Sequence, residues 1–224
     1  SIFFGGGTPS LMPPWLVERL ISLAETLFGF STNIEITAEA NPSSVETNAM
    51  LEFKRAGVNR VSLGIQSLND NDLKFLGREH SVAEALEALE KIRSSFSRVS
   101  IDLIYALPNQ SEKDWRNILR EAISLGLPHM SLYQLTIEAG TVFYSRQRRG
   151  EVMALEDDRA VDLYRTTQEL THTAGFSAYE VSNHAKTGEE CHHNLTYWKS
   201  GDWLGIGPGS HGRFAKAKND SDNI

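Results

Sequence analysis

Residues 1–29 of the chain read SIFFGGGTPSLMPPWLVERLISLAETLFG, in which a short apolar run, a glycine-rich turn and a helix follow one another. Ile2–Phe4 is typical of a buried strand, and Gly5-Gly6-Gly7 follows it directly. Pro13-Pro14 favours the start of a helix, because proline is tolerated in the first helical turn. Leucines spaced like one face of a helix predict its buried side: Leu16, Leu20, Leu23 and Leu27.

The same strand–helix unit recurs along the chain. Further strands are predicted at residues 33–38, 60–65, 99–105, 130–135 and, as a sixth, 177–182. Helices are predicted between them, two of them opened by the capping boxes Ser43/Glu46 and Ser81/Glu84 and two more at residues 111–126 and 155–174. This alternation predicts an α/β fold with a parallel sheet, and periodicity alone leaves open whether the sheet is a barrel or doubly wound.

Composition narrows the classes of protein. Of 224 residues, 40% are hydrophobic and 23% charged, as in ordinary globular domains, and no apolar run is long enough to span a bilayer. The net charge of −7 gives no electrostatic reason to expect nucleic acid as a partner. The single cysteine, Cys191, excludes a disulfide framework within the chain and fits a reducing compartment.

Unusual residues stand at the ends of the predicted strands. Gly5–Thr8, Glu39, Gln66 and Gln134 fall just past strand ends, and Asp102 lies within a strand. In parallel α/β folds, ligands bind at the carboxyl end of the strands. We therefore expect these positions to meet at one binding site.

Each candidate also has a simpler interpretation. Gly5–Thr8 allows a ligand close to the backbone, but it can equally be a flexible turn, and the lysine of a phosphate loop is missing. A carboxylate at Glu39 suits a ribose diol, yet most glutamates are solvated. Arg78 suits a carboxylate, although exposed arginines are common. Asp102 is the stronger candidate, because a buried acid needs a partner.

The segment Cys191–Trp198 reads CHHNLTYW and is followed by a glycine-rich stretch at residues 205–212. Its cysteine and histidines allow a zinc site, although their spacing does not match paired zinc ligands. They also suit axial ligation of haem beside aromatic rings. Residue types alone favour a loop whose aromatic rings fill the core. The basic run Arg146, Arg148 and Arg149 is read as a solvated face or a contact for porphyrin propionates.

Taken in order, the motifs resemble a known family. GGGTPS, the strand with Glu39, Leu63–Gln66 with Arg78-Glu79-His80, IDLIYALP at 101–108 and YQLTIEAGT at 133–141 resemble the radical S-adenosylmethionine core of the coproporphyrinogen III oxidase family. Residues 193–198, HNLTYW, match the HNxxYW motif of the HemW-type haem chaperones. The resemblance extends to about Phe214.

The resemblance implies a partial (β/α)6 TIM-like barrel, open on one side and, in this chain, truncated at both ends. Residues 1–145 would form the radical S-adenosylmethionine core without its first strand and cluster loop. Residues 146–215 would complete the barrel and carry the haem-linked HNxxYW segment, and 216–224 would be a polar tail.

The resemblance also implies ligands for particular residues. Gly6, Gly7 and Thr8 would meet the amino group of S-adenosylmethionine, Glu39 and Gln66 its ribose hydroxyls, Arg78 its carboxylate and Asp102 its nucleoside. His193 would be the haem-linked residue and ligand of the haem iron, with Cys191 as a second, weaker candidate.

One departure from the family is large. The family holds a 4Fe–4S cluster with a CxxxCxxC loop upstream of GGGTPS, and this chain has one cysteine, far from that place. We expect that the segment was cut away. The expected function is that of a haem chaperone passing haem to acceptors such as respiratory enzymes; the alternative is an enzyme, oxygen-independent coproporphyrinogen III oxidase. The expected location is the cytoplasm, or an organellar matrix if an amino-terminal address was removed.

Overall fold

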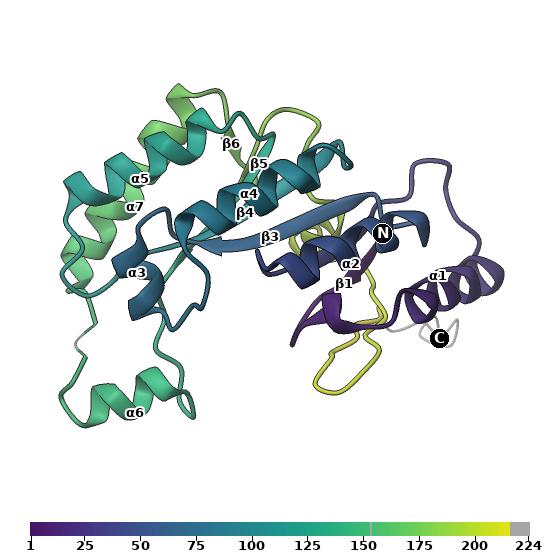
Figure 1. Ribbon diagram of the computed structural model, residues 1–224, viewed down its shortest axis with the longest axis horizontal. Helices are drawn as coiled ribbons and strands as arrows, with labels where there is room; N and C mark the ends of the chain where they lie inside the picture. Colours follow the sequence, from purple (N-terminus) through teal and green to yellow (C-terminus); the bar gives the residue numbers. More distant parts are fainter. Residues whose placement is uncertain (153, 216–224) are drawn as a thin grey trace, which may run out of the picture.

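The computed structural model describes residues 1–152 and 154–215, so the predicted tail at 216–224 lies outside the described residues (Figure 1). The strands are β1 Ile2–Phe4, β2 Ile36–Ala40, β3 Arg60–Gln66, β4 Arg98–Tyr105, β5 His129–Gln134, β6 Ser177–Ala178 and β7 Asn183–Ala185. The helices are the 3-10 helix η1 Pro9–Leu11 and the α-helices α1 Pro14–Phe28, α2 Ser44–Arg55, α3 Asp70–Phe75, α4 Val82–Arg93, α5 Glu112–Ser124, α6 Val142–Arg148, α7 Asp157–Thr173 and α8 His192–Trp198.

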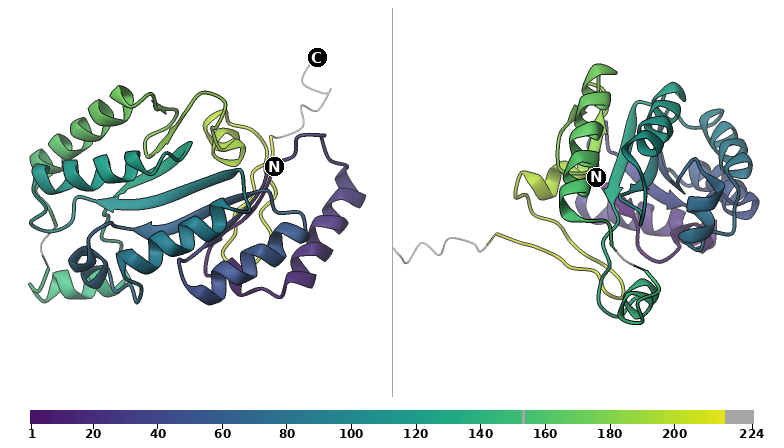
Figure 2. Two further views of the ribbon diagram at one scale, coloured as in Figure 1. Left: turned by 45° about the horizontal axis from the view of Figure 1, so that its top comes forward. Right: turned by 90° about the vertical axis from the view of Figure 1, so that its left-hand side faces the viewer.

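One sheet contains the described strands in the order β1-β2-β3-β4-β5-β7-β6. Strands β1 to β5 pair in parallel, as the alternation predicted. The sixth strand predicted at residues 177–182 is wrong, because β6 and β7 form an antiparallel hairpin on β5. The chain turns back where Glu180 Oε1 accepts hydrogen bonds from the Ser182 amide at 2.8 Å and from the Asn183 side chain. The sheet therefore curves without closing into a barrel (Figure 2).

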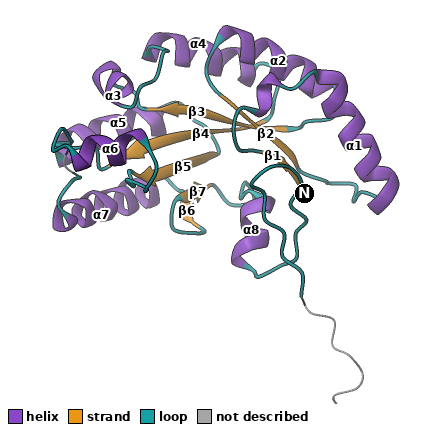
Figure 3. Cartoon of the chain, turned by 90° about the horizontal axis from the view of Figure 1, so that it is seen from below, coloured by secondary structure: helices purple, strands orange, loops and turns teal. Residues whose placement is uncertain are grey.

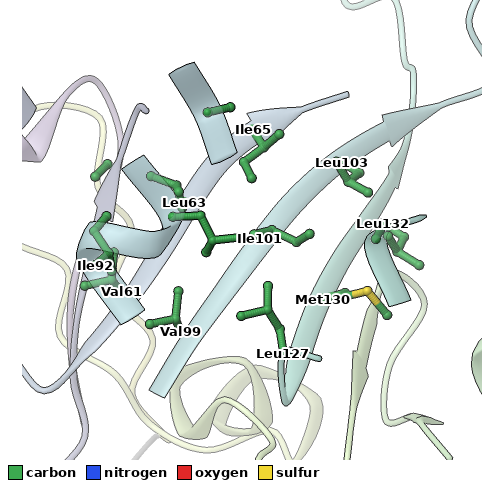
Figure 4. Close-up of a cluster of buried hydrophobic side chains, with 14 of the residues drawn as sticks. Val61, Leu63, Ile65, Ile92, Val99, Ile101, Leu103, Leu127, Met130 and Leu132 are labelled. Carbon is green, nitrogen blue, oxygen red and sulfur yellow. The ribbon is translucent and has the colours of Figure 1, made fainter. Parts of the chain in front are cut away.

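The two faces of the sheet differ in chemistry because successive side chains alternate. The outer face packs against α1, α2, α4, α5 and α7 and is aliphatic (Figure 4): Val61, Leu63, Ile65, Val99, Ile101, Leu103, Met130 and Leu132 are buried there. The inner face carries polar residues at the intervening positions: Thr37, Glu39, Arg60, Ser62, Ser100, Asp102, His129 and Ser131. Helix α8 lies on this side, next to β1 (Figure 3).

The helix starts agree with the sequence only in part. Ser81 and Glu84 form the predicted capping box of α4. The box predicted for Ser43 is only half present: its hydroxyl accepts from the Glu46 amide, but the Glu46 carboxylate accepts from the Asn41 amide at 2.7 Å and from Ser10. Glu46 thus connects α2 with the loop after β1.

The predicted buried face of α1 is wrong. Leu20, Leu23 and Leu27 are exposed, and the helix buries Val17 and Ile21 instead. Helix α1 lies at the end of the helix layer, over the edge strand β1, so only a narrow stripe of it meets the sheet and α2 (Figure 1).

Candidate functional site

The glycine loop after β1 closes over Glu39. The amide of Gly6 donates to Glu39 Oε2 at 3.1 Å, and Gly6 and Gly7 have φ values of 75° and 60°, a region that favours glycine. Thr8 then leads into η1. Glu39 lies within β2, one residue before its end, whereas the sequence placed it past the strand. Burial raises the pKa of Glu39, and the Gly6 hydrogen bond opposes this rise.

Gln66 folds back against the end of β2. It is the last residue of β3 and has a φ of 74°, at a shift in the register between β3 and β4. A Cβ on Gly64 would lie 2.6 Å from Gln66 Nε2 and 3.7 Å from Asn41 Oδ1. The bare glycine therefore makes room for the Gln66 amide between the carboxyl ends of β2 and β3.

Asp102 faces the same side of the sheet from β4. Its Oδ1 accepts from the Ser62 hydroxyl at 3.0 Å, and Ser62 is the register partner of Glu39. Burial raises the pKa of Asp102 to about 6, and hydrogen bonds from Ser131 and Ser62 oppose the rise. The negative charge of Glu39 raises the pKa further, so the two acids lie near enough to interact.

Arg78 is a half-buried cation without a counter-ion. Within residues 1–152 and 154–215, no carboxylate oxygen lies within 4 Å of its guanidinium, and burial lowers its pKa. The following His80 bonds through Nε2 to the Ile65 carbonyl at 3.1 Å, which ties this segment to the end of β3. A desolvated guanidinium without a partner suits an incoming carboxylate, which it can bind in bidentate geometry.

These residues form a donor set that fits S-adenosylmethionine, whose groups include an ammonium, a carboxylate and a ribose diol. The structure brings Gly6, Glu39, Gln66 and Asp102 to one end of the sheet. Gln134 is the last residue of β5 rather than past its end, and its side chain is exposed. The Asp102 carboxylate is hydrogen-bonded by Ser62 and Ser131. Sequence reasoning missed Tyr133, whose pKa is raised to about 12 by burial and by the charge of Asp102.

Helix α8 is anchored to the opposite end of β2. The side chain of Glu35, fully buried just before β2, accepts from the amides of His192 at 2.9 Å and His193 at 3.4 Å. Its second oxygen accepts from Arg98 at 2.7 Å. Sequence reasoning did not single out Glu35. Cys191, the residue before α8, is fully buried, its thiol donates to Glu35 at 3.4 Å, and burial raises its pKa.

The imidazole of His193 is part of an aromatic chain. It stacks on Phe3 of β1 with ring centroids 4.4 Å apart and 24° between the planes. Tyr197 meets the imidazole edge-on at 4.7 Å, and Trp203 meets Tyr197 at 4.5 Å. Burial lowers the pKa of His193 to about 4, so the ring is neutral at physiological pH, the form that ligates metals.

The other metal hypotheses fare differently. Across the residues that the structure describes, no group of three or more His, Cys, Asp and Glu side chains is placed to hold a metal ion. A 4Fe–4S cluster does not fit this chain, since Cys191 is its only cysteine and is buried against Glu35. In the basic run, Arg149 pairs with Glu151 at 2.5 Å, and Arg146 lies over the rings of Phe75 and Phe143.

The family follows from a comparison with known proteins. Residues 1–122 match the sequence model of the radical SAM superfamily, which is more than half of the chain. The chain belongs to the radical SAM superfamily. This radical SAM chain is 43% identical over 215 residues to the mouse protein named "Radical S-adenosyl methionine domain-containing protein 1, mitochondrial", covering 96% of the chain and 49% of the relative. It is 44% identical over 216 residues to "Heme chaperone HemW" of Haemophilus influenzae, covering 96% and 55%.

The radical SAM chain thus spans about half the length of the curated relatives it matches. Among solved structures, coproporphyrinogen III oxidase (HemN) from Escherichia coli superimposes with a TM-score of 0.75 at 21% identity, over 94% of this chain and 51% of that one. At this identity the likeness shows the fold alone, and it confirms the predicted TIM-like radical SAM architecture. None of the helices that the structure describes has the length and apolar character needed to cross a membrane.

Proposed function

We propose that this chain is the part of a haem chaperone that binds S-adenosylmethionine and contributes a haem ligand. The observation that carries the proposal is the placement of His193, whose neutral imidazole stacks on Phe3 of β1. The HemW relative is similar over nearly the whole chain, and its name describes a haem chaperone.

The S-adenosylmethionine site is assigned to the polar end of the sheet. Gly6, Gly7 and Thr8 bind the amino group, and Glu39 and Gln66 bind the ribose hydroxyls. Arg78, a cation without a partner among the described residues, binds the carboxylate. Asp102 faces the nucleoside from within β4.

Haem is assigned to His193, whose imidazole would ligate the iron while aromatic rings seat the macrocycle. Bound haem would supply the iron that the His193 imidazole would bind, and a single protein ligand would permit later release. Cys191 supports this role less well, because its thiol is buried and its pKa is raised. The acceptors would be haem-requiring proteins such as respiratory enzymes, in the cytoplasm or in the mitochondrial matrix that the names of some relatives suggest.

The enzyme alternative, coproporphyrinogen III oxidase, rests on the fold likeness to HemN. That reaction needs an iron–sulfur cluster to reduce S-adenosylmethionine, and the residues present here do not fit one. A cluster with cysteine ligands would have to be held by a segment outside this chain, so no chemical step is assigned.

The test is haem binding by the full-length protein, followed by its Soret band. We expect His193→Ala to lose the red shift of the bound haem. His192→Ala is the matched control, because His192 is adjacent to His193 in the sequence and its side chain is exposed. An unchanged Soret band in His193→Ala would remove His193 from the proposal.

S-adenosylmethionine binding is tested separately by calorimetry. Arg78→Gln is expected to weaken binding about tenfold or more, since a carboxylate would lose its charged partner. Arg120→Gln, an exposed arginine on α5, should bind like the natural protein. Equal affinity in all three proteins would contradict the assignment of Arg78.

A further inference from the structure

We propose that Phe3 is a positioning residue that fixes the His193 imidazole and connects it to Glu39, so that a ligand on Glu39 is sensed at His193. The proposal rests on the proposed function for the ligands of Glu39 and His193. Its structural half, the positioning of His193 by Phe3, stands on the contacts alone.

The first support is the stack itself. Phe3 and His193 lie face to face at 4.4 Å, and Tyr197 closes the other side of the imidazole edge-on at 88°. Offset-stacked and edge-to-face contacts of this kind stabilise a ring beyond simple burial. The plane of the imidazole ring is thereby fixed.

The second support is the space beside Gly5. A Cβ added to Gly5 would lie 2.7 Å from Phe3 Cε1 and 3.2 Å from Glu39 Oε2. Its φ lies outside the left-handed region, so lack of room rather than backbone conformation excludes a side chain here. The ring of Phe3 and the carboxylate of Glu39 therefore border the same small space, which the glycine leaves open.

The third support is that the backbones of Phe3 and His193 are both held in place. Phe3 pairs with Thr37 inside the sheet, and the amide of His193 is held by Glu35 at 3.4 Å. A ligand that takes the Glu39 carboxylate competes with the Gly6 amide and moves the oxygens that border Phe3. Because Glu39 Oε2 and Phe3 Cε1 border a space no wider than the missing Cβ of Gly5, a shift of the carboxylate displaces the Phe3 ring, and this ring is stacked on the imidazole.

The test uses proton NMR of the full-length protein without haem. The C2–H signal of His193 is assigned by its loss in His193→Gln. We expect Phe3→Leu to reduce the ring-current shift of this signal to the part that Tyr197 contributes. Phe4→Leu is the matched control, since Phe4 points to the outer face and packs against the aliphatic core. Addition of S-adenosylmethionine should move the His193 signal in the natural protein and in Phe4→Leu, but not in Phe3→Leu.

Two further variants keep the test decisive if Phe3→Leu fails to fold. Phe3→Tyr keeps the ring and should keep the shift, whereas Gly5→Ala should displace the ring and reduce it. A His193 signal that is the same in Phe3→Leu or Gly5→Ala as in the natural protein overturns the positioning role. Ligand binding measured by calorimetry without any movement of the His193 signal overturns the coupling.

Failure of the proposed function gives different results. If S-adenosylmethionine binds none of the proteins, the Glu39 site and the coupling both fall, while the ring-current result still decides whether Phe3 positions His193. If His193→Ala keeps the Soret band, the haem role falls and the positioning role remains.

Discussion

Arg98 of β4 donates to the Glu35 carboxylate at 2.7 Å, and the Glu35 side chain is fully buried while that of Arg98 is 24% exposed. Glu35 also accepts the first amides of α8, so one carboxylate joins two parts of the sheet to the HNxxYW helix. Because the Glu35 carboxylate is buried, the cation and amides around it replace the hydrogen bonds that water would supply.

Arg98→Met should therefore destabilise the fold strongly. Removing the cation breaks a buried ion pair and leaves the Glu35 carboxylate without its charged partner, which costs about 3–5 kcal/mol. The control is Arg55→Met, which breaks an exposed pair with Glu52 and should change the free energy of unfolding by less than about 1 kcal/mol. Urea unfolding of both variants gives the comparison, and similar losses in the two would contradict this account of Glu35.

Thr167→Val should destabilise the packing of α5 on α7. Trp115 Nε1 donates to the Thr167 hydroxyl at 2.8 Å, and both residues are buried. Valine keeps the shape but leaves the indole N–H without an acceptor, which costs about 1–3 kcal/mol. Thr173→Val, on the exposed end of the same helix, should be nearly neutral in the same thermal unfolding measurement. Equal melting temperatures for the two variants would count against the hydrogen bond.

The spacing of apolar residues indicates the buried face of α5 but not that of α1. In the helix predicted at residues 111–126, four apolar positions are spaced like one face of a helix, and all four are buried in α5: Trp115, Ile118, Leu119 and Ala122. The spacing of leucines in α1 was just as regular, yet those leucines are exposed. The difference is tertiary: α5 packs against α7 and stacks Trp115 on Tyr105 of β4, whereas α1 covers only the edge of the sheet. Spacing shows which residues share a face, but not whether anything covers it.

In the candidate site too, some residues were predicted from the sequence and others were missed. Glu39, Gln66 and Asp102 were predicted because parallel strands place their carboxyl ends together. Phe3 and Glu35 gave no such signal: a strand phenylalanine looks like core, and Glu35 meets α8 across 157 residues of sequence. Contacts of that range depend on where α8 docks, which no local pattern encodes. The polar residues alternating along β2 to β5 were the available sign that the inner face is a site.

Gly64→Ala should impair the ligand site with little loss of stability. Its Cβ would collide with Gln66 Nε2, the end of a flexible side chain, so the amide moves while the strand stays in place. We expect affinity for S-adenosylmethionine to fall about tenfold, as it should in Gln66→Ala. In the double variant the losses should not add, because both act on one amide. Additive losses in calorimetry would show that Gly64 acts by another route.

Asp102 should make the fold less stable as the pH rises. Its pKa is about 6 in the folded chain against 3.8 for the ordinary carboxyl, so between these values the folded state binds more protons than the unfolded state. Stability must then fall as the pH rises through this window, with a full loss of about 3 kcal/mol above pH 6. Asp102→Asn cannot ionise and lacks this contribution. The difference in unfolding free energy, Asp102→Asn minus natural protein, should therefore increase from pH 4 to pH 7 in urea titrations. A flat or falling difference for Asp102→Asn would mean that burial does not destabilise the ionised carboxyl of Asp102.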